Sequence, residues 1–311
     1  MQLPYFLQQK INSLFAGLGK KKLEQKRSEL TKKYKEETGR SVSLIDSKDD
    51  GLTYAISRMP STFAVTFTLV SGLVRQGLIQ GVETLIDFGS GTGAGYFAFK
   101  ELDDELDITL VERDQNMISV FKQLDENETT VIKNDILSFE SQNKYDLVFS
   151  SYVLSEMTES DRKKAFLKLL DCSEKYVLLI DTGTPKTYQD YMQLKELAYE
   201  NGYSVLAPCL HKNCKLQNDY CQFFARVERS ALQKMAKSAT LGYEDEKYFY
   251  LLLSKNNVEV DGCRVIRRPV IETNMVKLSL CTKDGVEIKT LTKKEKEMFK
   301  CAKKSKINDL I

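Results

Sequence analysis

Hydrophobic and polar positions follow one pattern in the first 80 residues and another pattern after them. In the first part, apolar residues recur every three or four positions, which predicts helices. The clearest stretches are residues 11–18, 21–37 and 63–78. We therefore expect an N-terminal helical region over residues 1–80.

In the second part, short apolar runs alternate with amphipathic stretches. The apolar runs predict strands at residues 83–88, 107–112, 129–135, 145–151, 175–181, 203–208 and 247–254. The amphipathic stretches predict helices at residues 94–102, 115–124, 161–172, 184–202 and 229–239. Strands that alternate with helices are typical of a parallel sheet covered on both faces. We expect an α/β domain over residues 81–255, interrupted by an insertion at residues 206–244.

The last part of the chain returns to alternating apolar and polar positions. Residues 260–292 read as a β-ribbon, with Lys283-Asp284-Gly285 as its hairpin turn. A lysine-rich stretch follows the ribbon. We expect residues 256–311 to form a C-terminal β extension with a basic tail.

A glycine-rich loop joins the first predicted strand of the α/β domain to its helix. The sequence LIDFGSGTGAG places Asp87, Gly89, Ser90, Gly91 and Gly93 at this turn. Glycines let the backbone turn sharply and approach a ligand closely. The spacing differs from the Gly-x-Gly-x-x-Gly dinucleotide fingerprint, and no Walker lysine follows. An acid two residues before the first glycine resembles motif I of class I S-adenosylmethionine-dependent methyltransferases. A tight turn without a ligand is the alternative.

Two acids follow the next strands at the same edge of the predicted sheet. Glu112 ends the second strand, where a carboxylate can accept both ribose hydroxyls of a nucleoside. Asp135 follows the third strand and could recognise an adenine amine. We expect S-adenosylmethionine to be bound by Asp87, Gly89, Ser90, Gly91, Gly93, Glu112 and Asp135.

The residues that would activate a methyl acceptor are harder to identify. Many amino-methyltransferases carry an Asp/Asn-Pro-Pro-aromatic motif after strand four, and this chain has SSYVLSEM there, at residues 150–157. Tyr152, Ser155 and Glu156 could act on a substrate, or could simply form the start of a helix beside the pocket. The sequence therefore leaves open whether the protein is an enzyme.

A short polar segment, PCLHKNCKLQNDYC at residues 208–221, gathers soft metal ligands. It contains Cys209, Cys214, Cys221 and the single histidine of the chain, His211. The spacings are wider than those of most zinc ribbons, and iron–sulfur spacings vary between families. A fourth ligand has to come from His211 or from elsewhere in the chain. The cysteines outside the segment that could supply it are Cys263, Cys281 and Cys301.

Charge and composition add two points. The 311 residues carry a formal net charge of only +2, but lysines crowd both ends of the chain, interleaved with acids. Ion-paired helix faces explain each run alone, while two basic ends are compatible with a nucleic-acid backbone as partner. Apolar runs stay well below the roughly 18 residues of a transmembrane helix. Seven cysteines without a secretory signal indicate a reducing compartment.

Several motifs together resemble the methyltransferase-like family of the mitochondrial small ribosomal subunit and its bacterial relatives. The matching stretches are YAISRMPSTFA, IDFGSGTGAG, SSYVLSE, GTP at residues 183–185, APC-x-H-x-x-C, FFARVERS, YEDEKYFYLLLS, RVIRRP and LSLCTKDG. The resemblance implies a methyltransferase fold and a [4Fe–4S] cluster held by Cys209, Cys214, Cys221 and Cys281. Zinc remains the alternative on chemistry alone. His211 is then a residue beside the ligands or one that faces RNA.

The resemblance also implies a function. We expect a small-ribosomal-subunit assembly or translation factor that binds rRNA, with phosphate contacts from Arg264, Arg267, Arg268 and the terminal lysines. An active rRNA methyltransferase is the alternative, and a zinc-stapled small-molecule methyltransferase is the second alternative. We expect a monomer off the ribosome, without a membrane segment, in a bacterial cytoplasm or alternatively the mitochondrial matrix. The chain departs from the family in having Asp181-Thr182 where Glu-Pro is common.

Overall fold

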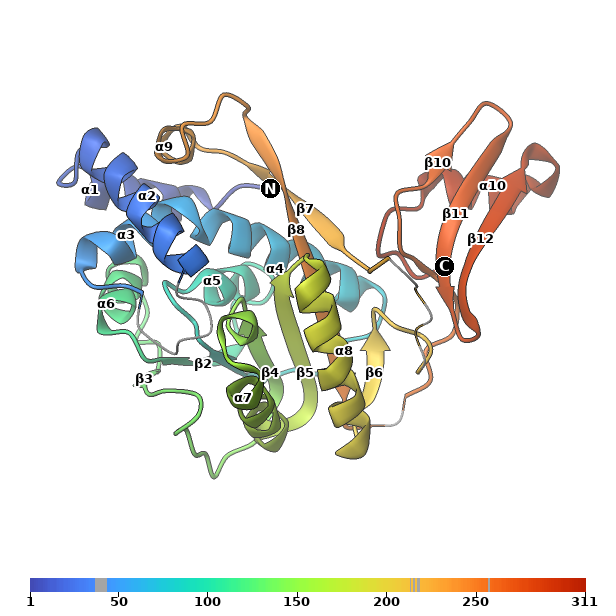
Figure 1. The fold of residues 1–311 in the computed structure, drawn as a ribbon, viewed down its shortest axis with the longest axis horizontal. Helices are drawn as coiled ribbons and strands as arrows, with labels where there is room; N and C mark the ends of the chain where they lie inside the picture. Colours follow the sequence, from blue (N-terminus) through green and yellow to red (C-terminus); the bar gives the residue numbers. More distant parts are fainter. Residues whose placement is uncertain (37–43, 213, 215, 217–218, 257) are drawn as a thin grey trace.

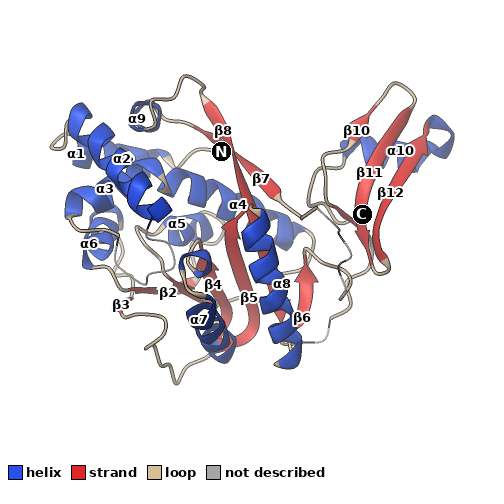
Figure 2. Cartoon of the chain, in the orientation of Figure 1, coloured by secondary structure: helices blue, strands red, loops and turns tan. Residues whose placement is uncertain are grey.

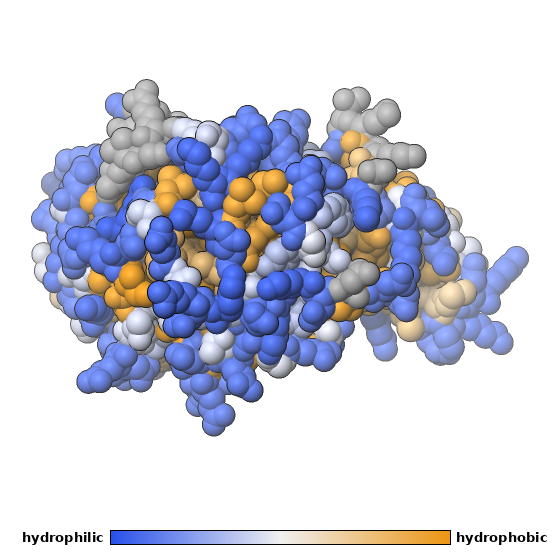
Figure 3. All heavy atoms as spheres, turned by 90° about the horizontal axis from the view of Figure 1, so that it is seen from below, coloured by the Kyte–Doolittle hydropathy of each residue, from blue (hydrophilic) through white to orange (hydrophobic). Residues whose placement is uncertain are grey.

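The computed structural model describes all residues except 37–43, 213, 215, 217–218 and 257. A large α/β body carries the N-terminal helices, and the C-terminal ribbon projects at one end of it (Figure 1). Hydrophilic side chains cover most of the face seen in Figure 3. Within the described part of the chain, no helix is both long and apolar enough to cross a membrane.

A single large sheet forms the centre of the α/β body. Its strands are β1 (Thr84–Phe88), β2 (Asp107–Glu112), β3 (Val131–Lys133), β4 (Tyr145–Ser151), β5 (Ser173–Thr182), β6 (Ser204–Ala207), β7 (Phe223–Glu228) and β8 (Tyr243–Ser254). They lie in the order β3-β2-β1-β4-β5-β8-β6. The first five are parallel, and β8 runs antiparallel between β5 and β6. This is a mixed α/β, Rossmann-like sheet. The alternation of strands and helices is as predicted, but the expectation of a parallel sheet is wrong for β8, which runs antiparallel to its neighbours.

One strand was not predicted from the sequence. Strand β7 pairs antiparallel with the first half of β8 and extends the sheet as a long ribbon. It lies within residues 206–244, the range predicted as an insertion. Part of that range therefore belongs to the sheet rather than to a separate insertion.

Helices pack around the sheet (Figure 2). The helices between the strands are α5 (Ala94–Lys100), α6 (Gln115–Leu124), α7 (Glu159–Cys172), α8 (Pro185–Glu200) and α9 (Ala231–Ala236). The N-terminal region contains α1 (Tyr5–Phe15), α2 (Lys20–Glu36), α3 (Lys48–Ser57) and α4 (Met59–Arg75). Side-chain oxygens of Ser47, Asp114 and Thr184 cap α3, α6 and α8. Helix α2 ends within the predicted stretch 21–37, whose last residue lies outside the described ones.

The C-terminal ribbon is a small sheet with one helix. Its elements are β9 (Arg264–Val265), β10 (Val270–Ile271), β11 (Met275–Thr282), β12 (Gly285–Thr292) and α10 (Lys296–Lys304). Strands β11 and β12 form the predicted hairpin, in which Thr282 pairs with Gly285. The ribbon buries a core of its own, made by Val265, Val276, Leu278, Leu280, Leu291, Phe299 and Ala302. This core holds the hairpin and α10 together.

The arginines of the RVIRRP motif do not share one role. Arg264 is fully buried and cannot contact RNA, so the expectation of a phosphate contact is wrong for it. Its guanidinium donates hydrogen bonds to the carbonyl of Pro208 (3.1 Å), to Gln76 Oε1 (3.0 Å) and to the carbonyl of Asn308 (3.0 Å). Arg264 thus ties the ribbon to the end of α4 and to the start of the cysteine segment.

The other two arginines stay at the surface. Arg267 donates to Asp219 Oδ2 (2.7 Å), and Arg268 donates to Asp245 Oδ2 (3.0 Å). The guanidinium of Arg268 also lies 3.8 Å from the centroid of the Phe224 ring. Both are engaged within the protein, so contacts with phosphate would have to share them.

Candidate functional site

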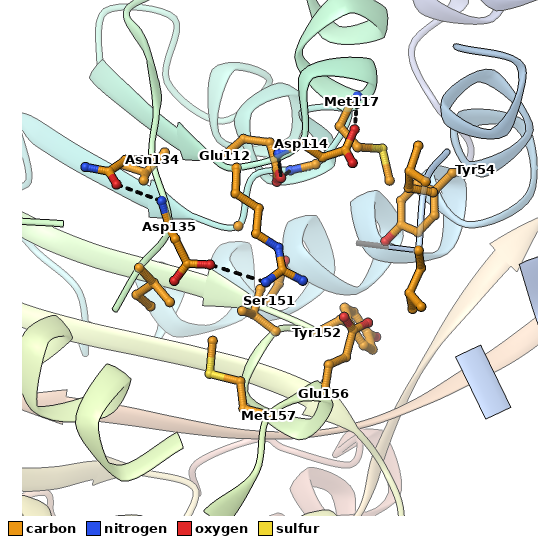
Figure 4. A pocket seen from close by; sticks show the side chains of 18 of the residues that line it. Tyr54, Glu112, Asp114, Met117, Asn134, Asp135, Ser151, Tyr152, Glu156 and Met157 are labelled. Carbon is orange, nitrogen blue, oxygen red and sulfur yellow. Dashed lines mark hydrogen bonds and ion pairs between the residues drawn. The ribbon is translucent and has the colours of Figure 1, made fainter. Parts of the chain in front are cut away.

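A cavity of about 290 Å³ lies at the carboxyl ends of β1, β2 and β4. Gly89, Gly91, Glu112 and Asp135 line it, as the sequence predicts (Figure 4). Asp87, Ser90 and Gly93 are buried beside it and do not line it. Four of the seven residues that are predicted to bind the cofactor therefore line one cavity.

The glycine loop needs glycine for steric reasons. Gly89, Gly91 and Gly93 have φ values of +73°, +56° and +85°, in the left-handed region that favours glycine. A Cβ at Gly89 would lie 2.3 Å from Val153 Cγ2, and one at Gly93 would lie 2.4 Å from Phe121 Cδ2. The loop therefore packs too closely for side chains at these two positions.

Two buried carboxyl groups flank the loop. Glu112 accepts hydrogen bonds from the backbone N–H of Gly91 and of Asp114, both at 2.8 Å. Burial raises the pKa of Glu112, and these two bonds oppose the shift. Burial, and next the Glu112 charge, raise the pKa of Asp87 well above its usual range. Among the described residues, Asp87 Oδ1 has no hydrogen-bond partner. A buried carboxyl oxygen without a partner is costly and fits a site that a ligand completes.

Asp135 is less free than the sequence suggests. It forms an ion pair with Arg113 (3.2 Å), and its other oxygen accepts from the N–H of Leu137 (2.9 Å). In Figure 4 a dashed line marks this ion pair at the carboxylate of Asp135. A contact with an adenine amine would therefore share Asp135 with Arg113.

Other cavity residues come from parts of the chain that no local motif identifies. Tyr34 and Tyr54 reach it from α2 and α3, and Met117 reaches it from α6. Only the packing of the N-terminal helices against the sheet brings the two tyrosines there. A scan for motifs has no signal for such residues.

The stretch after β4 is held by an acid at the end of β5. Asp181 is fully buried and accepts from the N–H of Ser155 (2.9 Å), from Ser155 Oγ (2.5 Å) and from the hydroxyl of Tyr191 (3.3 Å). This arrangement gives Asp181, the departure from the family pattern, a positioning role. Ser155 is occupied by this contact, while Glu156 points into the cavity (Figure 4).

Stability is expected to depend on pH through Glu156. Burial, and next the charge of Asp181, raise the pKa of Glu156 from 4.5 to about 8. Glu112 adds to the shift, while Arg113 and Arg58 oppose it. The folded state then holds the proton more tightly than the unfolded state, so this contribution to stability is lost as pH rises from 4.5 to about 8. Glu156 is only half-buried, so solvent screens part of this effect. We expect the unfolding free energy of Glu156→Gln to exceed that of the parent protein by about 1 kcal/mol above pH 8.

Urea unfolding of the parent protein and of Glu156→Gln, at several values between about pH 5 and about pH 9, measures this difference in unfolding free energy. The exposed Glu140→Gln is the control. A stability difference between Glu156→Gln and the parent that stays constant across this range would refute the assignment.

Four cysteines from two distant segments meet beside the sheet. Cys209, Cys221 and Cys281 are buried, and Cys214 is half-buried. Burial raises the pKa of Cys209, and the other three cysteines add to the shift, while the charge of Lys195 opposes it. Burial also raises the pKa of Cys221 to about 12, and Cys214 and Cys281 add to this shift, while Arg267 opposes it. Burial also opposes ionisation of Cys214, but hydrogen bonds from His211, Tyr188 and Leu216 lower its pKa to about 7. The thiols are therefore near enough to influence one another.

His211 lies inside this group and does not face RNA. It is 8% exposed, and its Nδ1 lies 2.9 Å from the carbonyl oxygen of Thr282 and 3.4 Å from Cys281 Sγ. The alternative of an RNA-facing histidine is therefore wrong. Within the ranges that the structure describes, no three His, Cys, Asp or Glu side chains are drawn together tightly enough to hold a metal ion as they stand.

The remaining cysteines differ from these four. Cys172 is buried at the end of α7, Cys263 is half-buried, and Cys301 is exposed on α10. Cys281 contacts the cysteine segment directly, because its Sγ lies 3.4 Å from Nδ1 of His211. Of the three candidates beyond the segment, the geometry favours Cys281.

The sequence is similar to a described family and to a human protein. The family model described as "Mitochondrial small ribosomal subunit Rsm22" matches residues 48–311. A human protein described as "Ribosome assembly protein METTL17, mitochondrial" is 23% identical over 288 residues, covering 84% of this chain and 62% of that protein. The chain thus spans less than two thirds of that relative's length.

Two of the similar solved structures are described as methyltransferases. The first is described as a putative RNA methyltransferase from Pyrococcus horikoshii and is 18% identical, with a TM-score of 0.42. The match covers 62% of this chain and 83% of that chain. A magnesium protoporphyrin IX methyltransferase from Synechocystis with bound SAM is 13% identical and covers 73% and 91%, with a TM-score of 0.43.

Proposed function

Since the chain belongs to the mitochondrial small ribosomal subunit Rsm22 family, we propose that it is a small-subunit assembly factor that binds rRNA, S-adenosylmethionine and an iron–sulfur cluster. The family match carries the proposal because it spans both the glycine loop and all four converging cysteines. The human relative, described as a mitochondrial ribosome assembly protein, supports the same role. It also supports the mitochondrial matrix as a location, with a bacterial cytoplasm as the other proposal.

The cofactor half of the proposal rests on the cavity at the glycine loop. The unpartnered Oδ1 of Asp87 and the raised pKa values of both acids fit a site that a cationic cofactor completes. Glu112 would hold the ribose and Asp135 the adenine, while the loop from Gly89 to Gly93 would pass closely around the cofactor. Bound S-adenosylmethionine supplies an electrophilic methyl group at this edge of the sheet.

The cluster half rests on the donor set. Cys209, Cys214, Cys221 and Cys281 would hold the cluster, and the positive charges of Lys195 and Arg267 nearby suit anionic thiolates. Such a cluster would crosslink the cysteine segment to strand β11. Zinc is the competing occupant, because four thiolates accept both.

Iron and sulfide analysis of protein purified without oxygen separates the two occupants. About four iron and four sulfide ions per chain, with a brown colour, support the cluster. A colourless protein with one zinc ion would instead support a zinc-stapled small-molecule methyltransferase, the second alternative.

Binding to ribosomal particles is expected to depend on the basic tail. Lys293, Lys294 and Lys296 are exposed at the junction of β12 and α10. Replacing all three with glutamine should weaken co-sedimentation with small-subunit particles. It should also flatten the salt dependence of log K by roughly 0.7–0.9 per lost phosphate contact.

A matched variant controls for net charge in this experiment. Lys122, Lys133 and Lys164 are exposed on the α/β body, and their replacement with glutamine removes the same charge. If both triple variants lose the same affinity for small-subunit particles, net charge explains the loss and the basic tail makes no specific contact with the particle. If the parent protein does not bind precursor or mature particles even at low salt, the proposed function itself fails.

One observation favours the alternative of an active rRNA methyltransferase. A second, larger cavity shares wall residues with the cofactor cavity at Tyr152 and Glu156. An acceptor group there would lie next to the cofactor. Comparing rRNA modification maps with and without the gene tests this alternative, and identical maps reject it.

A further inference from the structure

The second cavity has a volume of about 840 Å³ and lies between α2, the junction of α3 and α4, the start of α8, and the β7–β8 ribbon. It shares Tyr34, Tyr54, Tyr152 and Glu156 with the cofactor cavity. These four residues form the boundary between the two spaces. Any ligand of the second cavity would therefore meet the cofactor across this boundary.

The walls of the second cavity are basic. Among the residues that the structure describes, five Lys or Arg and three Glu line it. Glu244 engages two of the basic groups, since it forms ion pairs with Arg229 (2.5 Å) and with Lys237. The first turn of α8 also lines the cavity, and the N-terminus of this 16-residue helix adds partial positive charge. The cavity is thus suited to a ligand with negative charge.

Two arginines in the wall have donors to spare. The guanidinium of Arg58 approaches Glu246 at 3.8 Å, which is too far for a hydrogen bond. Within the described residues, the side chains of Arg58 and Arg27 make no hydrogen bond, and Arg27 forms no ion pair. Arginine forks of this kind bind phosphate with two parallel bonds.

The boundary end of the cavity is aromatic. Tyr34 and Tyr54 have ring centroids 6.2 Å apart, and the ring of Tyr152 lies 6.0 Å from the guanidinium of Arg58. Tyr152 is 9% exposed and has a φ of +58°, a strained conformation for a residue other than glycine. Within the described chain its buried hydroxyl has no hydrogen-bond partner. The strain and the unpartnered hydroxyl both point to a ligand atom at this end.

We propose that the second cavity binds one nucleotide of unpaired RNA, with its phosphate at Arg27 and Arg58 and its base at Tyr152 and Glu156. Unpaired bases stack on aromatic rings, and their edges form hydrogen bonds with carboxyl groups. The volume is large enough for one nucleotide. The choice of RNA rests on the proposed function, and the proposal extends it by giving the RNA a defined pocket.

Mononucleotides test this pocket directly. We would measure binding of AMP, GMP, CMP and UMP, and of the matching nucleosides, to the full chain by equilibrium dialysis, with S-adenosylhomocysteine measured on the same samples. At least one mononucleotide should bind, and its nucleoside should bind at least about 10-fold more weakly. Arg27→Gln and Arg58→Gln should each weaken the mononucleotide by about 10-fold and leave S-adenosylhomocysteine unchanged.

Arg75→Gln is the matched control, because Arg75 is an exposed arginine at the end of the neighbouring helix α4. It should leave both ligands unchanged, and thermal melting of each variant checks folding. The pocket is refuted if no mononucleotide binds while S-adenosylhomocysteine does, or if S-adenosylhomocysteine displaces the mononucleotide. Equal binding of inorganic phosphate also refutes it. Loss of S-adenosylhomocysteine binding by the parent protein would instead refute the cofactor half of the proposed function.

Discussion

Replacing Cys281 with serine is expected to abolish cluster binding and to release the C-terminal ribbon from the α/β body. Cys281 lies on β11, where it is 4% exposed, and it is the one converging cysteine supplied by the ribbon. A serine hydroxyl is a poor ligand for iron, so iron content should fall from about four ions per chain to below about one. Ligand binding and folding are coupled at such a site.

The size of this effect follows from the length of chain that the cluster closes. About 60 residues separate Cys221 from Cys281. A disulfide closing a loop of that length contributes about 4 kcal/mol, and a crosslinking cluster restricts the unfolded chain in the same way. Limited proteolysis should then cut between the α/β body and the ribbon in Cys281→Ser much faster than in the parent.

Two further cysteines make this experiment decisive. Cys301→Ser removes an exposed thiol on α10 and should leave iron content and proteolysis unchanged. Cys263→Ser tests the half-buried cysteine next to Arg264, which should also be neutral. If Cys281→Ser keeps its full iron content while Cys263→Ser loses it, the fourth ligand is Cys263 and our assignment is wrong.

Arg264 shows why the sequence alone mispredicts this region. The motif RVIRRP contains three arginines that look equivalent in the sequence, which predicts a phosphate contact for each of them. The fold buries the first against Pro208, Gln76 and Asn308, which come from three distant parts of the chain. Which arginine becomes a structural anchor depends on these long-range contacts, and local sequence carries no record of them.

The sheet is far more predictable than the cavity walls. Strands such as residues 84–88 are nearly continuous apolar runs because both of their faces are buried, so periodicity finds them. Strand β7 is absent from the predicted elements, although burial alternates along Phe223–Glu228 as it does in a strand with one buried face. Tyr34 and Tyr54 have no such signal, since they reach the cavity only after the N-terminal helices pack on the sheet.

A methyl group at Gly89 is expected to abolish cofactor binding. The φ of Gly89 is +73°, which costs an alanine roughly 1–2 kcal/mol. The new Cβ would also lie 2.3 Å from Val153 Cγ2. To relieve this clash, the glycine loop and the stretch at Val153 have to move apart, although the strands before them, β1 and β4, are paired in the sheet. Both line the cavity, and we expect Gly89→Ala to weaken S-adenosylhomocysteine binding by at least about 100-fold.

A second variant separates the clash from the backbone strain. Gly89→Ala combined with Val153→Ala removes the Cγ2 atom at 2.3 Å, although Val153 Cβ remains 3.4 Å away. The double variant should recover about 10-fold of the lost affinity, because the strain at φ +73° persists. Gly242→Ala is the control, since nothing lies within 4 Å of its added methyl group. If Gly89→Ala binds S-adenosylhomocysteine as tightly as Gly242→Ala does, the glycine loop does not hold the cofactor. The cavity beside Glu112 would then need a different ligand.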